Sequence, residues 1–309
     1  GTPMPLSTDT AGMSEGEIIE ATDPDAAFAA LADETRIEIL RTLGAVDGYE
    51  ATFSDLREAV GMADSGQFNY HLDKLTGHFL TKTDEGYRLT LAGVHVHGAL
   101  LAGAYTKTGT LDPVSLDEPC PGCGGARTFR YDGEMARFEC ADCPVSSFFA
   151  VPPGVFAGYG TDEWPAVAER YFRGYLRHAD SGFCPVCDGR MGGRLADRLA
   201  QEDPEEALPE EYRDFPTFRY ACERCEHGIA GDLGSGLLMR PPVVAFHYDN
   251  GVDVRDTPLS RFQTVGTDDA EIVSRDPLRV RLTYTAGGET LVLTVDDALA
   301  IRETDRSDS

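Results

Sequence analysis

Positive charge is scarce in this sequence, and lysine is the scarcest source of it. The chain has 309 residues, of which 27 are basic and 53 acidic, and its formal net charge is −26. Lysine occurs three times, at Lys74, Lys82 and Lys107. A surface of this sign repels polyanions, so any nucleic-acid binding would have to depend on more than charge attraction.

The acidic residues are spread along the chain rather than gathered in one tail. Together with the lack of lysine, this pattern resembles proteins of salt-loving archaea, whose molar potassium chloride screens the repulsion between like charges. The alternative is an ordinary acidic protein encoded by a GC-rich gene. We expect a halophilic, archaeal protein.

Long apolar segments are also missing. No run approaches the roughly 18 residues that a membrane span needs. The N-terminal segment has no cationic start followed by an apolar block, so it does not read as a secretory signal. Hydrophobic residues still make up 41% of the chain, which is enough for two or three globular domains. We expect a cytoplasmic protein.

Cysteines outside CxxC pairs are missing as well, because all eight fall in four such pairs. Two CxxC pairs complete a tetrahedral S₄ site for zinc, and 16 residues separate the first two pairs, as in a zinc ribbon. The intervening ARTFRYDGEMARF alternates around a turn at Asp132 and Gly133, which indicates a hairpin. The sequence predicts two structural Zn²⁺ sites, at Cys120, Cys123, Cys140 and Cys143 and at Cys184, Cys187, Cys222 and Cys225.

Other uses of these cysteines are less favoured. Disulfides are rare in a cytoplasmic chain, and a redox CxxC normally occurs once, at a helix N-terminus. Crossed pairing between the two ribbons remains open but is less local. The second ribbon carries an acidic insertion, LAQEDPEEALPEEYRDFP, between its pairs. Both sites have four protein ligands and no open position. The chain also lacks a nucleophile elbow and a phosphate loop, so no enzyme is expected.

The N-terminal part predicts a series of short helices. Asp23 caps a helix that begins at Pro24, Asp33 caps a second helix that ends at Gly44, and Ser54 caps a third. Asp64, with Ser65 as the alternative, caps a fourth helix over residues 64–79. Its predicted core stripe consists of Phe68, Leu72, Leu75 and Phe79.

A hairpin follows in LTKTDEGYRLT, and LAGVHVHGALLAGAY closes the domain as a helix. This order predicts a winged helix-turn-helix over residues 22–108. Residues 64–79 would be its reading helix.

The segments LADETRIEILRTL, FSDLREAVG and QFNYHLDKL resemble the ArsR-type winged-helix regulators. The whole chain is similar to haloarchaeal members that carry appended cysteine-rich domains. The resemblance covers residues 22–108 and implies a transcriptional regulator that dimerises through the first and last helices of this domain. Metal-sensing members carry Cys-x-Cys where this chain has Ser54, Asp55, Leu56 and Arg57, so arsenic sensing is not supported. His95 and His97 of the closing helix are two residues apart and face different ways, which favours a structural role.

The predicted DNA-reading face is nearly neutral. Residues 61–90 hold four acidic and three basic side chains, a net charge of −1. Base-edge hydrogen bonds and shape would then supply most of the affinity in high salt. His71 lies closer to the core stripe and either packs or touches a phosphate. The predicted DNA-binding residues are Ser65, Gln67, Asn69, Tyr70, His71, Lys74, Lys82 and Arg88. A winged helix used for protein contacts alone is the alternative.

The C-terminal half predicts a mixture of helices and strands. DEWPAVAERYFRGYLRHA reads as an amphipathic helix that packs Val167, Tyr171 and Leu176 on a ribbon. PPVVAFHYDNG is a short helix, VDVRDTPLSRF a turn and second helix, and EIVSRDPLRVRLTYTAGGETLVLTVDD two or three strands. This order also fits a degenerate second winged helix.

The sequence thus predicts a multidomain α+β protein. Its expected parts are a flexible N-terminus (1–21), a winged helix-turn-helix (22–108), zinc ribbon 1 (109–150), a linker helix (151–182), zinc ribbon 2 (183–232) and a small α+β domain (233–309). The expected function is sequence-specific binding of double-stranded DNA as a dimeric transcriptional regulator. The alternative is a zinc-ribbon adaptor that binds transcription machinery or RNA. RNA binding is disfavoured because residues 109–150 hold three arginines against seven acids.

Overall fold

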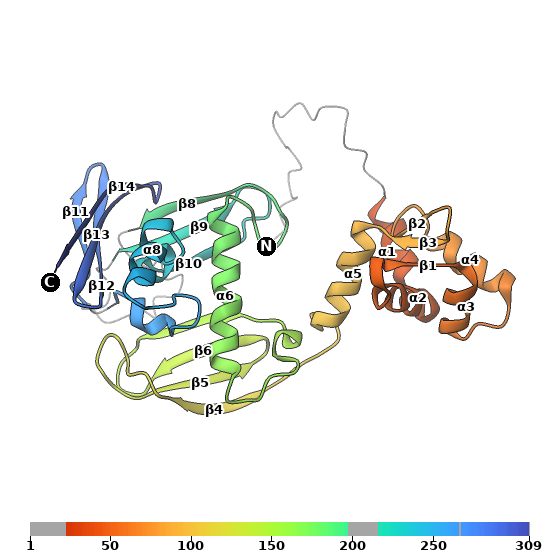
Figure 1. Cartoon of the computed structure of the whole chain (residues 1–309), viewed down its shortest axis with the longest axis horizontal. Coiled ribbons are helices and arrows are strands. Elements are labelled where there is room, and N and C mark those ends of the chain that lie inside the picture. The colour runs from red at the N-terminus through yellow and green to blue at the C-terminus, as the bar shows by residue number, and fades with distance from the viewer. Residues whose placement is uncertain (1–22, 197–215, 266, 309) are drawn as a thin grey trace, which may run out of the picture. The chain divides into compact units, whose positions relative to one another are not determined.

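The computed structural model of the chain describes residues 23–196, 216–265 and 267–308. The predicted flexible N-terminus and nearly all of the acidic insertion of ribbon 2 lie outside these residues. The described part is mixed α+β, with eight α-helices and four small antiparallel sheets (Figure 1). It divides into two compact units, with the boundary between Leu101 and Ala102. No helix in the described part of the chain is long and apolar enough to cross a membrane.

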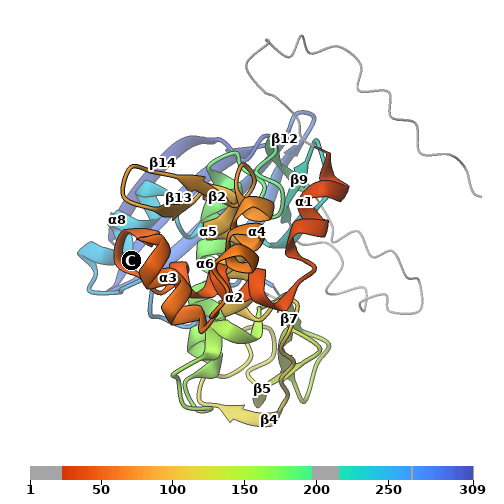
Figure 2. The same ribbon diagram turned by 90° about the vertical axis from the view of Figure 1, so that its right-hand side faces the viewer.

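The first unit consists of helices around a small sheet (Figure 2). The helices are α1 (Pro24–Leu31), α2 (Glu34–Gly44), α3 (Phe53–Val60), α4 (Ser65–Leu75) and α5 (Leu91–Ala102). The strands β1 (Glu50–Ala51), β2 (Leu80–Lys82) and β3 (Tyr87–Leu89) pair in the order β1-β3-β2. Leu40, Leu56, Phe68 and Leu72 are fully buried at the centre of this unit.

Side-chain caps set most of the helix starts in this unit. Asp23, Asp33 and Asp64 accept hydrogen bonds from backbone N–H groups of the first turns of α1, α2 and α4, as predicted. The predicted cap Ser54 is wrong. Thr52 has the extended backbone of a cap and its hydroxyl accepts from the Asp55 N–H at 3.2 Å, so α3 begins at Phe53.

The predicted reading helix is shorter than residues 64–79. Thr76 turns to an extended conformation and its hydroxyl donates to the Leu72 carbonyl at 2.7 Å, which ends α4 at Leu75. Gly77 follows with φ +90°, a conformation that favours glycine. Phe79 is still buried, with 7% exposure, but it reaches the core from the turn rather than from the helix.

The second unit holds the other three sheets. Its strands are β4 (Leu111–Leu116), β5 (Arg127–Asp132), β6 (Met135–Cys140), β7 (Ser146–Ala150), β8 (Met191–Ala196), β9 (Thr217–Cys222), β10 (Gly228–Asp232), β11 (Ala270–Arg275), β12 (Leu278–Ala286), β13 (Glu289–Asp296) and β14 (Ile301–Asp308). The sheet orders are β4-β5-β6-β7, β10-β9-β8 and β11-β12-β13-β14. The helices are α6 (Trp164–Asp180), α7 (Leu233–Leu237) and α8 (Pro241–Asp249).

Several predictions for this unit are confirmed. The β5–β6 hairpin pairs Asp132 with Met135 across a turn in which Gly133 and Glu134 both have positive φ. The helix predicted from DEWPAVAERYFRGYLRHA is α6, which runs between the sheets β4–β7 and β8–β10 (Figure 1). Its Val167 is buried in the core of the first of these sheets and its Leu176 in the core of the second.

One prediction for the C-terminal part is wrong. VDVRDTPLSRF forms no α-helix; a short 3₁₀ turn, η5 (Leu259–Phe262), follows Pro258 instead. The segment EIVSRDPLRVRLTYTAGGETLVLTVDD forms three strands, β11, β12 and β13, as predicted, and β14 adds a fourth strand beyond it. Strand β14 lacks apolar alternation because it is the exposed edge of the sheet, so its sequence IRETDRSD gives no strand signal.

A buried charged pair ties α6 to the segment before the last sheet. Glu169 and Arg173, both about one-twentieth exposed, lie one helical turn apart. Glu169 accepts the Leu259 N–H at 2.9 Å, and Arg173 donates to the Thr257 carbonyl. Burial raises the pKa of Glu169, while the Leu259 N–H and Arg173 oppose that rise. The pair fixes the orientation of α6 against this segment.

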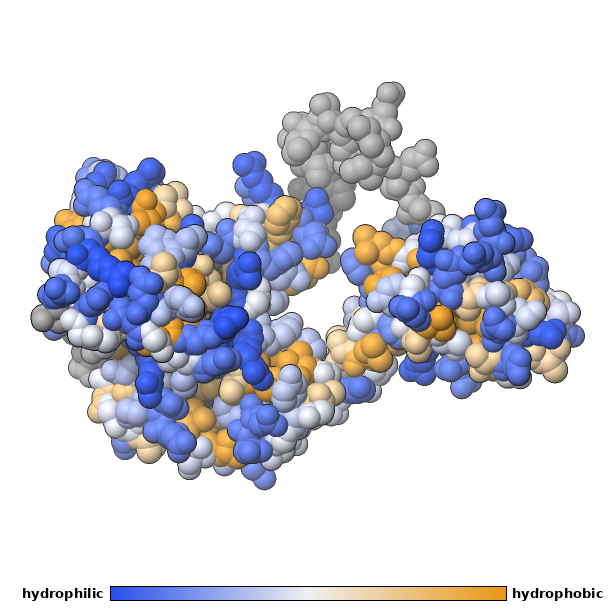
Figure 3. Space-filling model, viewed as in Figure 1, coloured by the Kyte–Doolittle hydropathy of each residue, from blue (hydrophilic) through white to orange (hydrophobic). Residues whose placement is uncertain are grey.

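The core of the second ribbon continues into the C-terminal sheet as one cluster, with Phe218, Leu237, Phe246 and Leu293 among its buried members. Hydrophilic side chains cover much of the visible face of each unit (Figure 3). This agrees with the strongly acidic composition.

One buried polar group makes the stability of the second unit depend on pH. His247 of α8 is 2% exposed and is surrounded by the rings of Phe246, Phe262 and Tyr284. Neither ring nitrogen has a hydrogen-bond partner among the described residues. Burial lowers the pKa of His247 below its ordinary value of 6.5.

We expect His247 to destabilise the protein in mild acid. As the pH falls through about 6.5, the unfolded chain takes up a proton at His247 that the folded chain refuses, so the unfolding free energy falls by at most about 1.4 kcal/mol per pH unit. His247→Phe should make this slope shallower in denaturant titrations between pH 7.5 and 5.5 (a window of roughly one unit either side of the histidine pKa). Exposed His95→Gln is the control. An unchanged slope in His247→Phe would contradict the assignment.

Candidate functional site

Eight cysteine sulfurs form two compact clusters in the second unit. Cys120, Cys123, Cys140 and Cys143 make the first, and Cys184, Cys187, Cys222 and Cys225 the second. Within each cluster the four sulfurs lie within 4.8 Å of one another. The local pairing predicted from the sequence is therefore confirmed, and the crossed pairing is not what forms.

The spacing of the sulfurs fits a tetrahedral metal site. The Cys120–Cys143 and Cys123–Cys140 sulfur pairs are 3.6 and 3.5 Å apart, and the Cys184–Cys225 and Cys187–Cys222 pairs 3.7 and 3.5 Å. A Zn–S distance of about 2.3 Å places sulfurs about 3.8 Å apart at the corners of a tetrahedron. A disulfide would require about 2.05 Å. The two clusters thus fit zinc ribbons.

The two clusters are built by the same backbone hydrogen bonds. In the first, Cys120 N–H donates to the Gly125 carbonyl and Gly124 N–H to the Cys120 carbonyl. In the second, Cys184 N–H donates to Gly189 and Asp188 N–H to Cys184. The later CxxC pairs also match, because Cys140 N–H donates to Val145 and Cys222 N–H to His227. The internal repeat predicted from the sequence therefore extends to the backbone.

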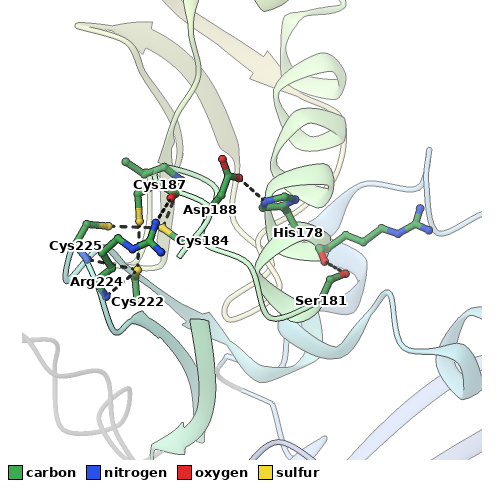
Figure 4. A network of polar contacts seen from close by, with 10 residues as sticks. His178, Ser181, Cys184, Cys187, Asp188, Cys222, Arg224 and Cys225 are labelled. Atoms are coloured by element: carbon green, nitrogen blue, oxygen red, sulfur yellow. Dashed lines mark hydrogen bonds and ion pairs between the residues drawn. The ribbon is translucent and has the colours of Figure 1, made fainter. Parts of the chain in front are cut away.

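Backbone N–H groups also point at the sulfurs. Gly125 donates to Cys123 and Asp142 to Cys140, each at 3.4 Å, while Arg224 donates to Cys222 at 3.3 Å. Such bonds stabilise thiolates. In the second cluster the Arg224 guanidinium also donates to the Cys187 carbonyl, which joins the two CxxC pairs (Figure 4).

The pKa shifts of the cysteine thiols indicate that a cation would stabilise each cluster. The Cys225 N–H, together with that of Arg224, lowers the pKa of Cys222 to about 6 against the effect of burial. The Gly189 N–H lowers the pKa of Cys187, but the neighbouring sulfurs raise it to about 12. Burial acts to raise the pKa of Cys140, but the Asp142 N–H and the neighbouring sulfurs lower it to about 7. Burial raises the pKa of Cys143 to about 12. Four thiolates cannot coexist at these distances without a positive ion between them.

The second cluster has one feature that sequence reasoning missed. A Cβ added to Gly189 would lie 3.1 Å from the Cys187 sulfur and 3.3 Å from the Cys222 sulfur. Glycine at this position therefore leaves room for the sulfurs to converge. Gly125 holds the matching position in the first cluster. A glycine two residues after the CxxC pair in both repeats was therefore the sequence signal for this feature.

The predicted DNA-binding residues all belong to the first unit. Ser65, Gln67, Asn69, Tyr70 and Lys74 are exposed on α4. Asn69 donates its amide to Asp73 at 3.0 Å, and the Lys74 ammonium lies 5.5 Å from the centre of the Tyr70 ring.

The other three predicted residues are placed differently. His71 is 6% exposed, with Nδ1 3.4 Å from an Asp33 carboxylate oxygen, so its ring packs inside rather than on the surface. Lys82 and Arg88 are exposed on β2 and β3, but the register pairs Lys82 with Tyr87 and Arg88 with Thr81. The side chains of Lys82 and Arg88 therefore lie on opposite faces of the β2–β3 hairpin.

The two histidines of α5 also diverge. His95 is exposed, whereas His97 is half-buried against α2, where a Cβ on Gly44 would clash with its ring. This packing agrees with the structural role that their spacing favours.

The comparisons with known proteins identify two domains. A family model described as a domain of unknown function, DUF7351, matches residues 117–301, and a second one, DUF7347, matches residues 24–100. The first match covers more than half of the chain, which therefore belongs to the DUF7351 family. No curated protein and no solved structure matches the chain.

Gly189 provides a test of the second cluster that leaves all eight cysteines in place. We expect Gly189→Ala to lose zinc from this cluster at a lower chelator concentration than the wild type, because the added Cβ crowds two sulfurs. Gly192→Ala, whose Cβ meets nothing within 4 Å, is the matched control on the same ribbon. Zinc released to a chromogenic chelator measures both, and equal release curves would contradict the crowding argument.

Proposed function

We propose that this chain is a DNA-binding transcriptional regulator that reads the major groove of double-stranded DNA with α4 in a winged helix-turn-helix. The exposed face of α4 supports this most strongly. Gln67, Asn69 and Tyr70 are exposed there, while Phe68 and Leu72 anchor the opposite face in the core. Amide side chains pair well with base edges, above all with adenine.

The surrounding elements fit this use of α4. Helix α3 precedes it across a short turn, and the hairpin β2–β3 follows it in the position of a wing. The hydrogen bond from Asn69 to Asp73 orients the Asn69 amide on the exposed side of the helix. Lys74 beside Tyr70 adds a positive charge for a phosphate.

The regulator is a homodimer in this proposal, joined through α1 and α5. Phe28 of α1 is 73% exposed and Leu91 of α5 is 72% exposed, although both are large apolar side chains. A partner seated on these two helices would cover both side chains. A dimer would present two copies of α4 to two half-sites of one operator.

The two cysteine clusters hold two structural Zn²⁺ ions in this proposal. Four thiolates fill the coordination sphere of each ion, so the metal stabilises the ribbons and takes no part in chemistry. The protein works in the cytoplasm of a halophilic archaeon, which agrees with its net charge of −26 and its three lysines.

An adaptor that binds transcription machinery through its ribbons is the second candidate. Val186, between the first two ligands of the second cluster, is 62% exposed, and Phe183 beside it is 54% exposed. Exposed apolar side chains on a ribbon loop are typical of protein contacts. This candidate predicts no sequence-specific footprint on DNA.

Changing Gln67, Asn69 and Tyr70 together to Ala should abolish sequence-selective DNA binding. Each good base contact contributes about 1–3 kcal/mol of discrimination, so the specific affinity should fall at least about 100-fold, to the non-specific level. Footprints on the promoter region of its own gene, in roughly 2 M potassium chloride to match a halophile cytoplasm, measure this. The zinc content should stay at two per chain.

A charge-neutral double variant on α2, Glu38→Ala with Arg41→Ala, is the control for surface changes away from α4 and should keep the footprint. Retained selectivity in the triple variant would remove α4 from the mechanism. No footprint with the folded wild type, on genomic fragments or at lower salt, would favour the adaptor.

A further inference from the structure

The exposed face of α6 is free of acidic residues, which is unusual in a chain of net charge −26. Arg170, Gly174, Arg177 and His178 are exposed along it. The helix contains two acidic residues, and neither lies on this face. Glu169 is buried, and Asp180 accepts from the Tyr220 hydroxyl and pairs with Arg240.

Within the described part of the chain, packing does not require a glycine at position 174. Gly174 lies inside a 17-residue helix, where glycine is less favourable than alanine because it loses more backbone freedom on folding. A Cβ added there would meet nothing within 4 Å. Its effect is instead to leave space above the helix.

That space is a shallow groove, largely open to solvent, with a volume of about 470 Å³ between α6 and the first CxxC loop of the second ribbon. Tyr171, Tyr175 and Pro185 give it apolar walls around Gly174. The two tyrosine ring centres are 6.2 Å apart, too close to admit a third ring between them, so a flat ligand would lie against them and over Gly174.

The two ends of the groove differ in charge. Arg170 lies at one end, with its guanidinium 5.8 Å from the ring centre of Tyr159, and pairs with no carboxylate among the described residues. His178 lies at the other, eight residues or about 12 Å along the helix. Its Nε2 is 3.5 Å from an Asp188 oxygen (Figure 4). An anion is therefore favoured at the Arg170 end alone.

We propose that this groove binds a small organic anion with a flat aromatic body, its carboxylate, sulfonate or phosphate on Arg170 and its ring over Gly174. Guanidinium groups bind such anions through paired hydrogen bonds. The Tyr175 hydroxyl, 2.8 Å from His227 Nε2, holds one wall in place. The site lies wholly in the second unit and goes beyond the proposed function, because it requires nothing of α4 or of DNA.

Two fluorescent probes that differ by a single charge test this site. The probe 8-anilinonaphthalene-1-sulfonate is an aromatic anion, and N-phenyl-1-naphthylamine is the same molecule without the sulfonate. The full-length, zinc-loaded protein in roughly 2 M potassium chloride should bind the anion with saturation, about fivefold or more tighter than the neutral probe. Arg170→Gln should remove this preference and leave the neutral probe unaffected.

Gly174→Leu should weaken the binding of both probes about tenfold or more, because the leucine side chain fills the groove. The thermal midpoint of unfolding should stay equal or rise, since leucine favours a helix. Ala166→Leu places the same side chain on the exposed face of α6 outside the groove. It should leave the affinity for both probes unchanged. Equal binding by the wild type and Gly174→Leu would overturn the proposal. Absence of saturable binding of the anion to the wild type below about 1 mM would do the same.

Discussion

Four sulfur atoms held within 4.8 Å of one another are the constraint on which the second unit depends. As thiolates the four sulfurs repel one another, and as thiols they leave the two CxxC loops of each ribbon without a bond between them. The sheet β8–β10 has three strands of five or six residues, which is close to the limit of independent stability. A cation bound between the sulfurs removes their repulsion. Its bonds to the four cysteines hold the two CxxC pairs of each ribbon together.

Helix α6 then links the two ribbons into one body. Val167 and Leu176 are buried in different cores, and Glu169 and Arg173 hold the segment that leads to the last sheet. The side of α6 that faces the two cores is therefore occupied by packing contacts. Its outward side is not, and this is where Gly174 lies together with Arg170, which pairs with no carboxylate of residues 23–196, 216–265 and 267–308.

The two surfaces to which we assign binding have a common physical character. Each lies on a helix whose opposite face is anchored in a core, and each carries less negative charge than the chain as a whole. In a protein of net charge −26 such regions can approach an anion without strong repulsion. The first unit offers polar side chains suited to base edges, and the second an arginine above apolar walls.

Local chemistry determined much of this protein from its sequence alone. The cysteine ligand sets, the caps Asp23, Asp33 and Asp64 and the β5–β6 turn depend on neighbours a few residues away or on CxxC spacing, so they could be predicted. The exposed face of α4 followed from helical periodicity. The DNA that this face is proposed to read stays a prediction.

Only the tertiary structure decided the remaining features. Strand β14 is polar at nearly every position and exists because β13 offers it a backbone partner. The ring of His71 lies with Nδ1 3.4 Å from an oxygen of Asp33, a residue distant in sequence. The groove over Gly174 exists because the CxxC loop of Pro185 packs next to α6. Each of these depends on contacts between residues far apart along the chain, which periodicity and spacing cannot encode.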